Sequence, residues 1–138
     1  MTRISSSIKP IELCDKMLIA EHREIKRIPN AIKNGKALVK DIPNSYRLGT
    51  GHVKFFYNKL AYLHERYKEL LAECKERGFN VTDYNECFED LPTELYKNWE
   101  EGAEVRKIVV ERINERLSTM KAIKYYSDDI PLQNITLI

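Results

Sequence analysis

The chain has 138 residues, of which 43% are hydrophobic and 32% are charged, with five glycines and five prolines. These values are typical of a helix-rich globular protein and exclude disordered and fibrous classes. A chain of this length can bury roughly 65–70% of its unfolded surface in one core, so we expect a single domain over residues 1–138. The net charge of +2 is too small to indicate a partner.

Several classes of protein are excluded by what the sequence lacks. Its uncharged stretches fall far short of the ~20 apolar residues of a membrane helix, and a polar run, residues 5–7, stands where a signal peptide has its apolar region. We therefore expect a cytoplasmic protein with no membrane partner. Cys14, Cys74 and Cys87 form no CxxC pair and no zinc-ligand pattern, which predicts reduced, structural thiols and no metal.

The charge is distributed unevenly along the chain. Residues 1–40 carry nine basic and four acidic side chains, a net charge of +5, so the remainder of the chain sums to −3. Residues 83–104 contain eight acidic side chains and only Lys97 as a base. A polyanion would therefore have to approach the N-terminal part of the chain.

Apolar residues at three- and four-residue spacing predict a first helix from Pro10 to Pro29, because proline suits the first helical position and the residues beyond a helix end. Its buried stripe comprises Ile11, Cys14, Leu18, Ile25 and Ile28, widened by Leu13, Met17 and Ala20. A loop rich in turn-forming residues follows.

The same periodicity predicts a second helix from Thr50 to Arg77, with Gly78 as a left-handed cap. Its stripe comprises Val53, Phe56, Leu60, Leu63, Tyr67, Leu70 and Cys74. Residues 79–100 are predicted to be irregular, apart from a short turn of helix after Pro92.

A third helix is predicted from Glu101 to Lys121, and its stripe comprises Val105, Val109, Ile113 and Leu117. Residues 127–138 receive no assignment. Since no segment combines alternating apolar residues with a hairpin turn, we expect an all-α domain of three main helices with long irregular connections.

The first helix also carries a cationic stripe. Lys16, Arg23 and Arg27 recur at helical spacing around the small Ala20, and Glu24 borders them. Positively charged side chains at this spacing could bind phosphate groups. On this helix alone, ordinary surface ion pairs with Glu21 and Glu24, worth about 0.3–0.5 kcal/mol each, are the favoured account.

Other polar residues taken alone also indicate structure rather than chemistry. Arg112 and Arg116 form an i, i+4 pair among acidic neighbours, which predicts a solvent-exposed face of the helix. His22, His52 and His64 form no HxxxH or HExxH pattern, so each is expected to be structural. No G-x-S-x-G, P-loop or dinucleotide fingerprint is present.

Three stretches taken together change this interpretation: MTRI at 1–4, ELCDKMLIAEHREIKRI at 12–28, and YRLGTGHVKFFYNKLAYLHERYKELLAECKERGFN at 46–80. They resemble the phage pyrimidine-dimer DNA glycosylase/AP lyase family, also called UV endonuclease V, which incises UV-damaged DNA. The resemblance implies a compact three-helix fold and a monomeric enzyme that acts on damaged double-stranded DNA without a cofactor.

The resemblance further implies that removal of Met1 leaves the α-amine of Thr2 as the nucleophile. This amine would attack the anomeric carbon of the damaged nucleotide, expel the base and form an imine, after which β-elimination breaks the strand. An ordinary α-amine, with a pKa of about 7.7–8.0, is roughly one-tenth neutral at pH 7, whereas a lysine would need strong desolvation.

Glu24 occupies the family's catalytic glutamate position, within AEHRE, where it would stabilise the sugar cation and then take the sugar proton. The family's DNA-binding positions are matched by Arg3, Arg23, Arg27, Arg112, Arg116 and Lys124. These residues would hold the phosphates of a kinked duplex.

The sequence departs from the family pattern at two points of recognition. Met17 stands where the family usually carries a histidine, and Ala122 replaces the tryptophan of an aromatic C-terminal motif. Stacking of a base on an aromatic side chain contributes about 1–3 kcal/mol to binding. The loss of this tryptophan therefore leaves open which lesion the protein recognises. Three alternatives remain: action on a different damaged base, a DNA-binding relative with weak or no turnover, and an all-α interaction module.

Overall fold

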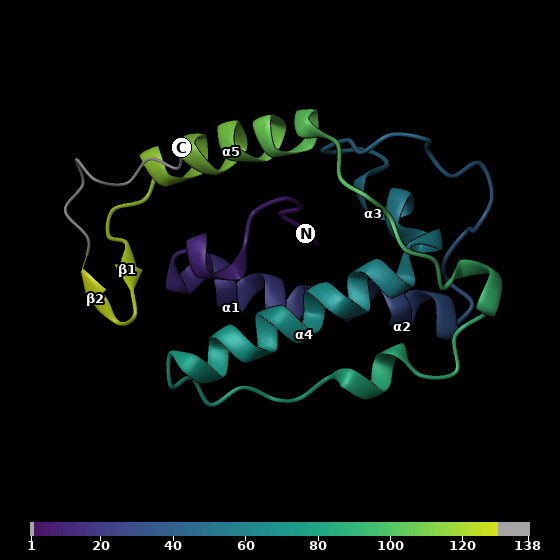
Figure 1. Ribbon diagram of the computed structural model, residues 1–138, viewed down its shortest axis with the longest axis horizontal. Coiled ribbons are helices and arrows are strands. Elements are labelled where there is room, and N and C mark those ends of the chain that lie inside the picture. Colours follow the sequence, from purple (N-terminus) through teal and green to yellow (C-terminus); the bar gives the residue numbers. More distant parts are fainter. Residues whose placement is uncertain (1, 130–138) are drawn as a thin grey trace.

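The computed structural model describes residues 2–129, and Figure 1 shows a molecule built almost entirely of helices and loops. The all-α prediction is confirmed. The helices are α1 (Asp15–Glu24), α2 (Arg27–Lys33), α3 (His52–Phe55), α4 (Leu60–Glu76) and α5 (Ala103–Ser118). Short 3-10 turns span Pro10–Glu12, Phe56–Asn58, Asn85–Phe88 and Thr93–Leu95. Two-residue strands β1 (Lys124–Tyr125) and β2 (Asp128–Asp129) pair antiparallel.

The prediction of one continuous helix from Pro10 to Pro29 is wrong. Leu13 is extended, with ψ of 141°, and a second break separates α1 from α2 at residues 25–26. Pro29 lies in the first turn of α2, where a missing N–H costs no helical hydrogen bond. The break at Leu13 also changes the register, so Ile11 is 52% exposed while Leu13 is buried.

The second predicted helix is also divided. Lys59, with φ of −128° and ψ of 40°, separates α3 and its following 3-10 turn from α4. The predicted apolar stripe is nevertheless buried, Val53 only partly so. Gly78 has φ of +79°, and the amides of Gly78 and Phe79 bond the carbonyls of Lys75 and Cys74, which forms the predicted left-handed cap.

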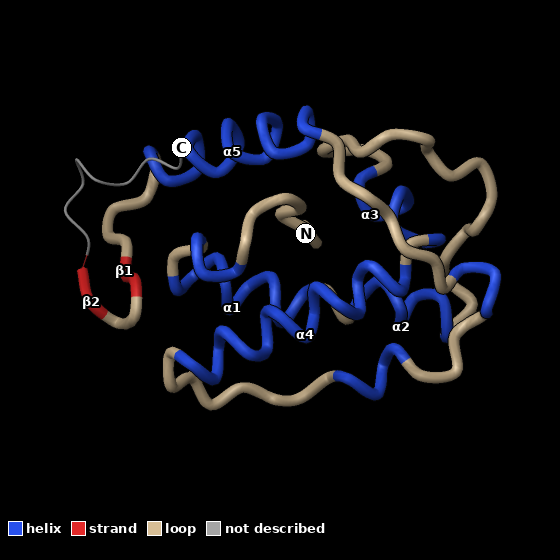
Figure 2. Tube along the Cα trace, viewed as in Figure 1, coloured by secondary structure: helices blue, strands red, loops and turns tan. Residues whose placement is uncertain are grey.

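The last predicted helix is shorter at both ends than expected, but all four of its stripe residues are buried. Residues 79–100 are irregular except for two 3-10 turns, one of them after Pro92 as predicted. Figure 2 shows this segment running back along α4 and past α2 and α3 before it reaches α5. Most of the unassigned tail, residues 127–138, lies outside the described residues.

The N-terminal segment, residues 2–9, passes through the middle of the fold between α5 and the α1–α4 pair (Figure 1). Ile4 and Ile8 are each 1% exposed and belong to the same hydrophobic cluster as the apolar stripes of α1, α4 and α5. This segment therefore fills the space between the long helices, and its own backbone needs hydrogen-bonding partners there.

A buried ion pair supplies two of those partners. Glu21 and Arg66 are 4% and 6% exposed, and Arg66 donates from Nε and Nη2 to the two Glu21 carboxylate oxygens. Glu21 Oε1 also accepts from the Ser5 amide at 3.2 Å, and Arg66 Nη1 donates to the Ile8 carbonyl at 2.9 Å. The prediction that Glu21 forms a surface ion pair is wrong, because its side chain faces α4.

A second buried arginine, Arg77, lies at the C-terminal end of α4. Arg77 bonds Asp15 at 3.0 Å and Glu73 at 2.8 Å, and its guanidinium lies over the rings of Tyr125 and Tyr126. Asp15 in turn accepts from the backbone amides of residues 126 and 127. These contacts attach the β1–β2 hairpin to the start of α1.

Two simpler properties complete the description. Cys14, Cys74 and Cys87 are free thiols, as predicted. Within residues 2–129, none of the helices combines the length and the apolar character needed to cross a bilayer.

Replacing Arg66 by methionine tests the buried pair. The change keeps an unbranched apolar chain but leaves the Glu21 carboxylate and the Ile8 carbonyl without their partner. We expect the free energy of unfolding to fall by about 3–5 kcal/mol, measured by urea unfolding at pH 7.

Lys68→Met is the matched control on the same helix. Lys68 pairs with Glu65 at 3.3 Å, and these side chains are 53% and 69% exposed. Its loss should cost about 0–1 kcal/mol. Similar losses for both variants would contradict the role assigned to the Glu21–Arg66 pair.

Candidate active site

A pocket of about 250 Å³ opens where the N-terminal segment meets α1 and α5. Its walls also include the loop before α3. The lining residues are Arg3, Ile4, Ser5, Met17, Ala20, Glu21, Glu24, Tyr46, Leu48, Val109, Arg112, Ile113 and Arg116. The pocket thus combines an apolar floor with a few charged groups, the usual composition of a ligand site.

The charged groups of this pocket come from three separate parts of the chain. Glu24 is the last residue of α1, Arg3 belongs to the N-terminal segment, and Arg112 and Arg116 are one turn apart on α5. A neighbouring recess of about 210 Å³ shares the same three arginines and adds Glu115 and Thr119. Glu21 also lines the pocket but is paired with Arg66, so the three arginines outnumber the two remaining carboxylates, Glu24 and Glu115, and this arrangement favours an anionic ligand.

The remaining sequence-predicted site residues lie around this pocket rather than in its lining. Thr2 is half-buried and directly precedes Arg3. Arg23 is exposed, with its Nη2 3.6 Å from Glu24 Oε2. Arg27 is exposed at the start of α2, and Lys124 is exposed in β1, opposite Asp129.

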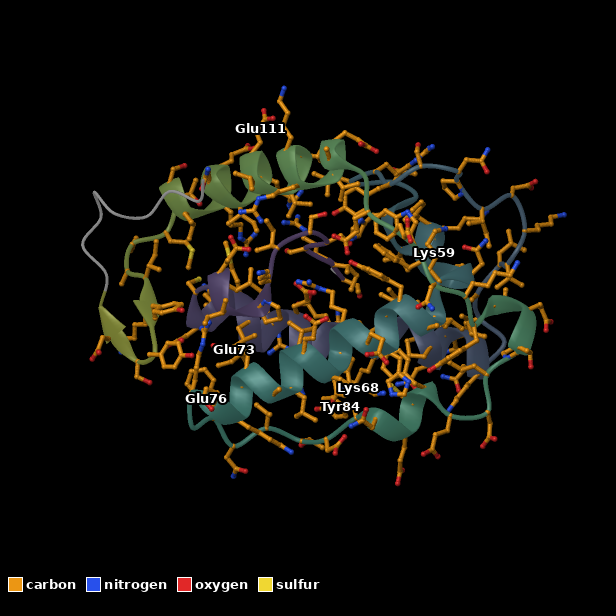
Figure 3. All side chains as sticks on the ribbon, viewed as in Figure 1. Lys59, Lys68, Glu73, Glu76, Tyr84 and Glu111 are labelled. Carbon is orange, nitrogen blue, oxygen red and sulfur yellow. The ribbon has the colours of Figure 1, made fainter. Side chains whose placement is uncertain are left out.

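The side chain of Glu24 is 15% exposed, so it is partly shielded but still accessible from the pocket. Glu111 lies on the outer side of α5 (Figure 3), which leaves the arginine pair to line the pocket. The structure brings Arg3, Glu24, Arg112 and Arg116 together although the sequence separates them by up to 113 positions.

Two side chains hold Ile4 at the edge of this pocket. The Ile4 amide donates to His52 Nε2 at 2.9 Å, and the Ile4 carbonyl accepts from the Tyr46 hydroxyl at 3.0 Å. His52 Nδ1 lies 2.8 Å from the Arg47 carbonyl. Since Nε2 accepts and the carbonyl requires a donor, His52 is neutral with its proton on Nδ1.

The loop before α3 sets the position of His52. Gly51 has φ of +90°, and a Cβ there would lie 3.0 Å from Cδ of Arg47. Burial is the largest influence on His52 and lowers its pKa below the usual range. The Arg47 carbonyl and Glu21 act in the opposite direction, and Arg3 adds to the lowering. The neutral form required by the hydrogen bonds is therefore also the form that burial favours.

Sequence reasoning missed Glu21, Tyr46 and His52 as residues that organise the site. One signal was available for Glu21, which lies three residues after Leu18 and four before Ile25 and so falls on the apolar stripe of α1. Arg66 falls on the stripe of α4 in the same way, between Leu63 and Leu70. A charge at a core position indicates a buried partner, whereas no periodicity indicates the contacts of Tyr46 and His52.

The profile of the pyrimidine dimer DNA glycosylase family matches residues 1–86 of the chain. This range covers more than half of the 138 residues, and it contains the N-terminal segment, Glu24, Tyr46 and His52. The chain belongs to this family. The resemblance seen in the sequence is thereby confirmed.

Membership gives the general function: a DNA repair protein of the DNA glycosylase class, with damaged DNA as its substrate. The part of the chain that the family profile matches ends at residue 86, before α5. Arg112 and Arg116, which line the pocket, therefore lie outside the matched range. In residues 2–129, no three His, Cys, Asp or Glu side chains are grouped so that they could hold a metal ion.

The lowered pKa of His52 predicts a pH dependence of stability. Below pH ~6.5 the unfolded chain takes up a proton at this histidine that the folded chain resists, so unfolding becomes easier as the pH falls. The contribution is complete above pH ~6.5 and is lost as the pH falls through the lower native pKa. We therefore expect His52→Gln to lose less stability than the wild type between pH 7 and pH 5, measured by urea unfolding.

Equal losses in the two proteins would contradict this assignment. The groups that face His52 are Glu21, Arg3, Tyr46 and the Arg47 carbonyl. All of them are unchanged in the His52→Gln variant, so the difference isolates the histidine.

Proposed function

We propose that the protein is a DNA glycosylase with AP lyase activity whose nucleophile is the α-amine of Thr2, exposed by removal of Met1. The observation that carries the proposal is the pocket in which Glu24 meets Arg3, Arg112 and Arg116 beside the start of the chain. Thr2 is bonded directly to Arg3, so its amine is within reach of this pocket. An amine, a carboxylate and several phosphate-binding cations are the groups that this chemistry needs.

The chemistry proceeds in balanced steps. The neutral amine of Thr2 forms a bond to C1′ of the damaged nucleotide, while the C1′–N bond breaks and its electron pair leaves with the base, which takes up one of the two amine protons. Opening of the C1′–O4′ bond then gives the imine, and the second amine proton goes to O4′, which becomes the C4′ hydroxyl. Removal of a C2′ proton then expels the 3′ oxygen with its phosphate, and water later hydrolyses the imine.

Glu24 would act twice in this sequence. Its carboxylate stabilises positive charge on the sugar while the base leaves, and it then accepts the C2′ proton that permits elimination. The shielded position of Glu24 supports this role, because electrostatic stabilisation is larger where water is excluded.

The arginines would hold the DNA backbone around the reacting sugar. Arg3, Arg112 and Arg116 converge on the pocket and its neighbouring recess, where guanidinium groups can bind phosphate oxygens in pairs. Arg23 and Arg27 extend the cationic surface along α1 and α2, and we keep Lys124 as an outer contact. These contacts suit a double-stranded DNA substrate. The proposal also includes a monomeric protein and a cytoplasmic location, which these contacts do not test.

A different damaged base is the second candidate substrate. Met17 lies in the pocket floor, at the position where the sequence departs from the family pattern. A thioether packs against flat apolar surfaces but supplies no strong hydrogen bond. A damaged base recognised by shape is therefore a candidate substrate besides a pyrimidine dimer.

Reduction with borohydride tests the imine. Incubation of the mature protein with abasic-site or dimer-containing DNA should trap a covalent adduct at the N-terminal residue, located by peptide mass spectrometry. Thr2→Ser should trap at nearly the wild-type rate, because the reactive atom is the backbone nitrogen.

An extra residue inserted ahead of Thr2 is the matched control for that variant. It keeps every side chain but moves the amine by one residue, so adduct formation should fall at least about 100-fold. Absence of any adduct with the mature wild-type protein on both substrates would leave the non-catalytic DNA-binding relative or the interaction module.

Glu24→Gln and Arg112→Ala separate chemistry from binding. Glu24→Gln should bind damaged DNA as well as the wild type but lose strand incision by about 100-fold or more. Arg112→Ala should weaken binding and reduce the slope of log affinity against log salt by about 1. Fluorescence anisotropy and gel-based incision assays measure the two effects.

Lys107→Ala provides the control for Arg112→Ala, since Lys107 is exposed on the same helix and does not line the pocket. Its effect on affinity should be several-fold smaller. Unchanged incision in Glu24→Gln would remove that carboxylate from the mechanism.

A further inference from the structure

We propose that His52 and Tyr46 are positioning residues that fix the reactive N-terminal amine by holding both polar groups of the Ile4 backbone. The inference rests on the proposed function, because it assigns to both side chains a role that acts through the Ile4 backbone on the Thr2 amine, although Tyr46 also lines the pocket. We call the His52–Ile4–Tyr46 arrangement the N-terminal latch.

The latch holds Ile4 from two sides. Its amide is bound by an imidazole nitrogen and its carbonyl by a phenol, at 2.9 and 3.0 Å, and Ile4 itself is 1% exposed. His52 and Tyr46 are 4% and 8% exposed, and their rings meet edge to face at 5.4 Å. Two buried rings therefore fix one residue of a segment that has no helix or strand of its own.

The amine of Thr2 lies only two residues before Ile4, so the position of Ile4 limits where the amine can move. Two residues of extended chain span at most about 7 Å, so the nitrogen of Thr2 can move only within that distance of the latched Ile4. Proximity effects in catalysis are steep, and a displacement of about 1 Å can cost on the order of 100-fold in rate. A loosened Ile4 would therefore slow attack on the sugar even with every catalytic group present.

The latch has a rigid foundation. His52 is fixed by the Arg47 carbonyl and by the left-handed turn at Gly51, while Tyr46 stacks on Trp99 at 5.9 Å. On the other side of Ile4, the buried Glu21–Arg66 pair binds the backbone of Ser5 and Ile8. The latch therefore ties the start of the chain to α3, and the Glu21–Arg66 pair ties it to α1 and α4.

The fold contains another buried histidine–tyrosine pair, whose hydrogen bonds and ring contacts within residues 2–129 do not involve the N-terminal segment. His22 Nε2 lies 3.2 Å from the Tyr67 hydroxyl, their rings are 5.3 Å apart, and the Tyr67 oxygen accepts from the Tyr84 amide. His22 and Tyr67 are 2% and 0% exposed. This pair provides a control matched in residue type and burial, and it differs from the latch in that His22 and Tyr67 lie within hydrogen-bond distance of each other.

Single-turnover borohydride trapping on abasic-site DNA measures how the latch affects the rate of adduct formation. At saturating DNA, the rate of adduct formation should fall about threefold to tenfold in Tyr46→Phe and about tenfold to 100-fold in His52→Leu. The dissociation constant for the DNA should change by less than about threefold. His52→Gln restores an acceptor near the position of Nε2 and should recover part of the rate lost in His52→Leu.

Tyr67→Phe and His22→Leu should trap adducts at the wild-type rate even where they lower the melting temperature as much as the latch variants do. Hydrogen–deuterium exchange gives a second readout, since residues 4–8 should exchange faster in His52→Leu and Tyr46→Phe than in these controls. Tyr46→Phe removes one oxygen atom and keeps the test available if His52→Leu does not fold.

The possible outcomes separate this inference from the proposed function. No adduct with the wild type would overturn the imine mechanism and the positioning role with it. Adducts that form as fast in folded latch variants as in the wild type would overturn the latch alone. A loss shared equally by the control pair, or one confined to DNA affinity, would also overturn it.

Discussion

The fold depends on how its N-terminal segment is satisfied inside the protein. A backbone without helix or strand partners can cross a core only if side chains bind its amides and carbonyls. Glu21 and Arg66 do this at Ser5 and Ile8 while neutralising each other. Burial alone would lower the pKa of Arg66, but the Glu21 carboxylate outweighs that effect and raises it. The charged pair and the segment that it binds therefore require one another.

This arrangement explains why the candidate site lies where it does. The buried segment brings Arg3 between α1 and α5, and residues from all three elements line the pocket. Glu24 ends α1 at that point, and the arginine pair of α5 completes the charge. A member of this family built in this way has its proposed nucleophile two residues before a backbone segment that buried side chains bind at Ile4, Ser5 and Ile8, which reduces the ordering needed when DNA binds.

Much of the helical content was accessible from sequence, and so were four residues that the structure brings to one pocket, Arg3, Glu24, Arg112 and Arg116, whose roles remain predictions. The stripes of α4 and α5 and the cap at Gly78 follow from periodicity and glycine chemistry, and Glu24 follows from its motif. The breaks at Leu13 and Lys59 did not follow, because the apolar spacing continues across both. Arg23, Arg27 and Lys124 lie outside the pocket lining, and their contacts with DNA remain predictions.

By itself, the sequence determined the fold class, the family and the residue types available for chemistry, because these depend on local periodicity and on contiguous motifs. Only the tertiary structure decided which charges are buried and which face the pocket. Glu21 and Glu24 are three residues apart on one helix, yet one binds Arg66 in the core and the other lines the pocket. Periodicity places Glu21 on the apolar stripe of its helix, but its partner Arg66 lies 45 residues away, and no local pattern identifies that contact.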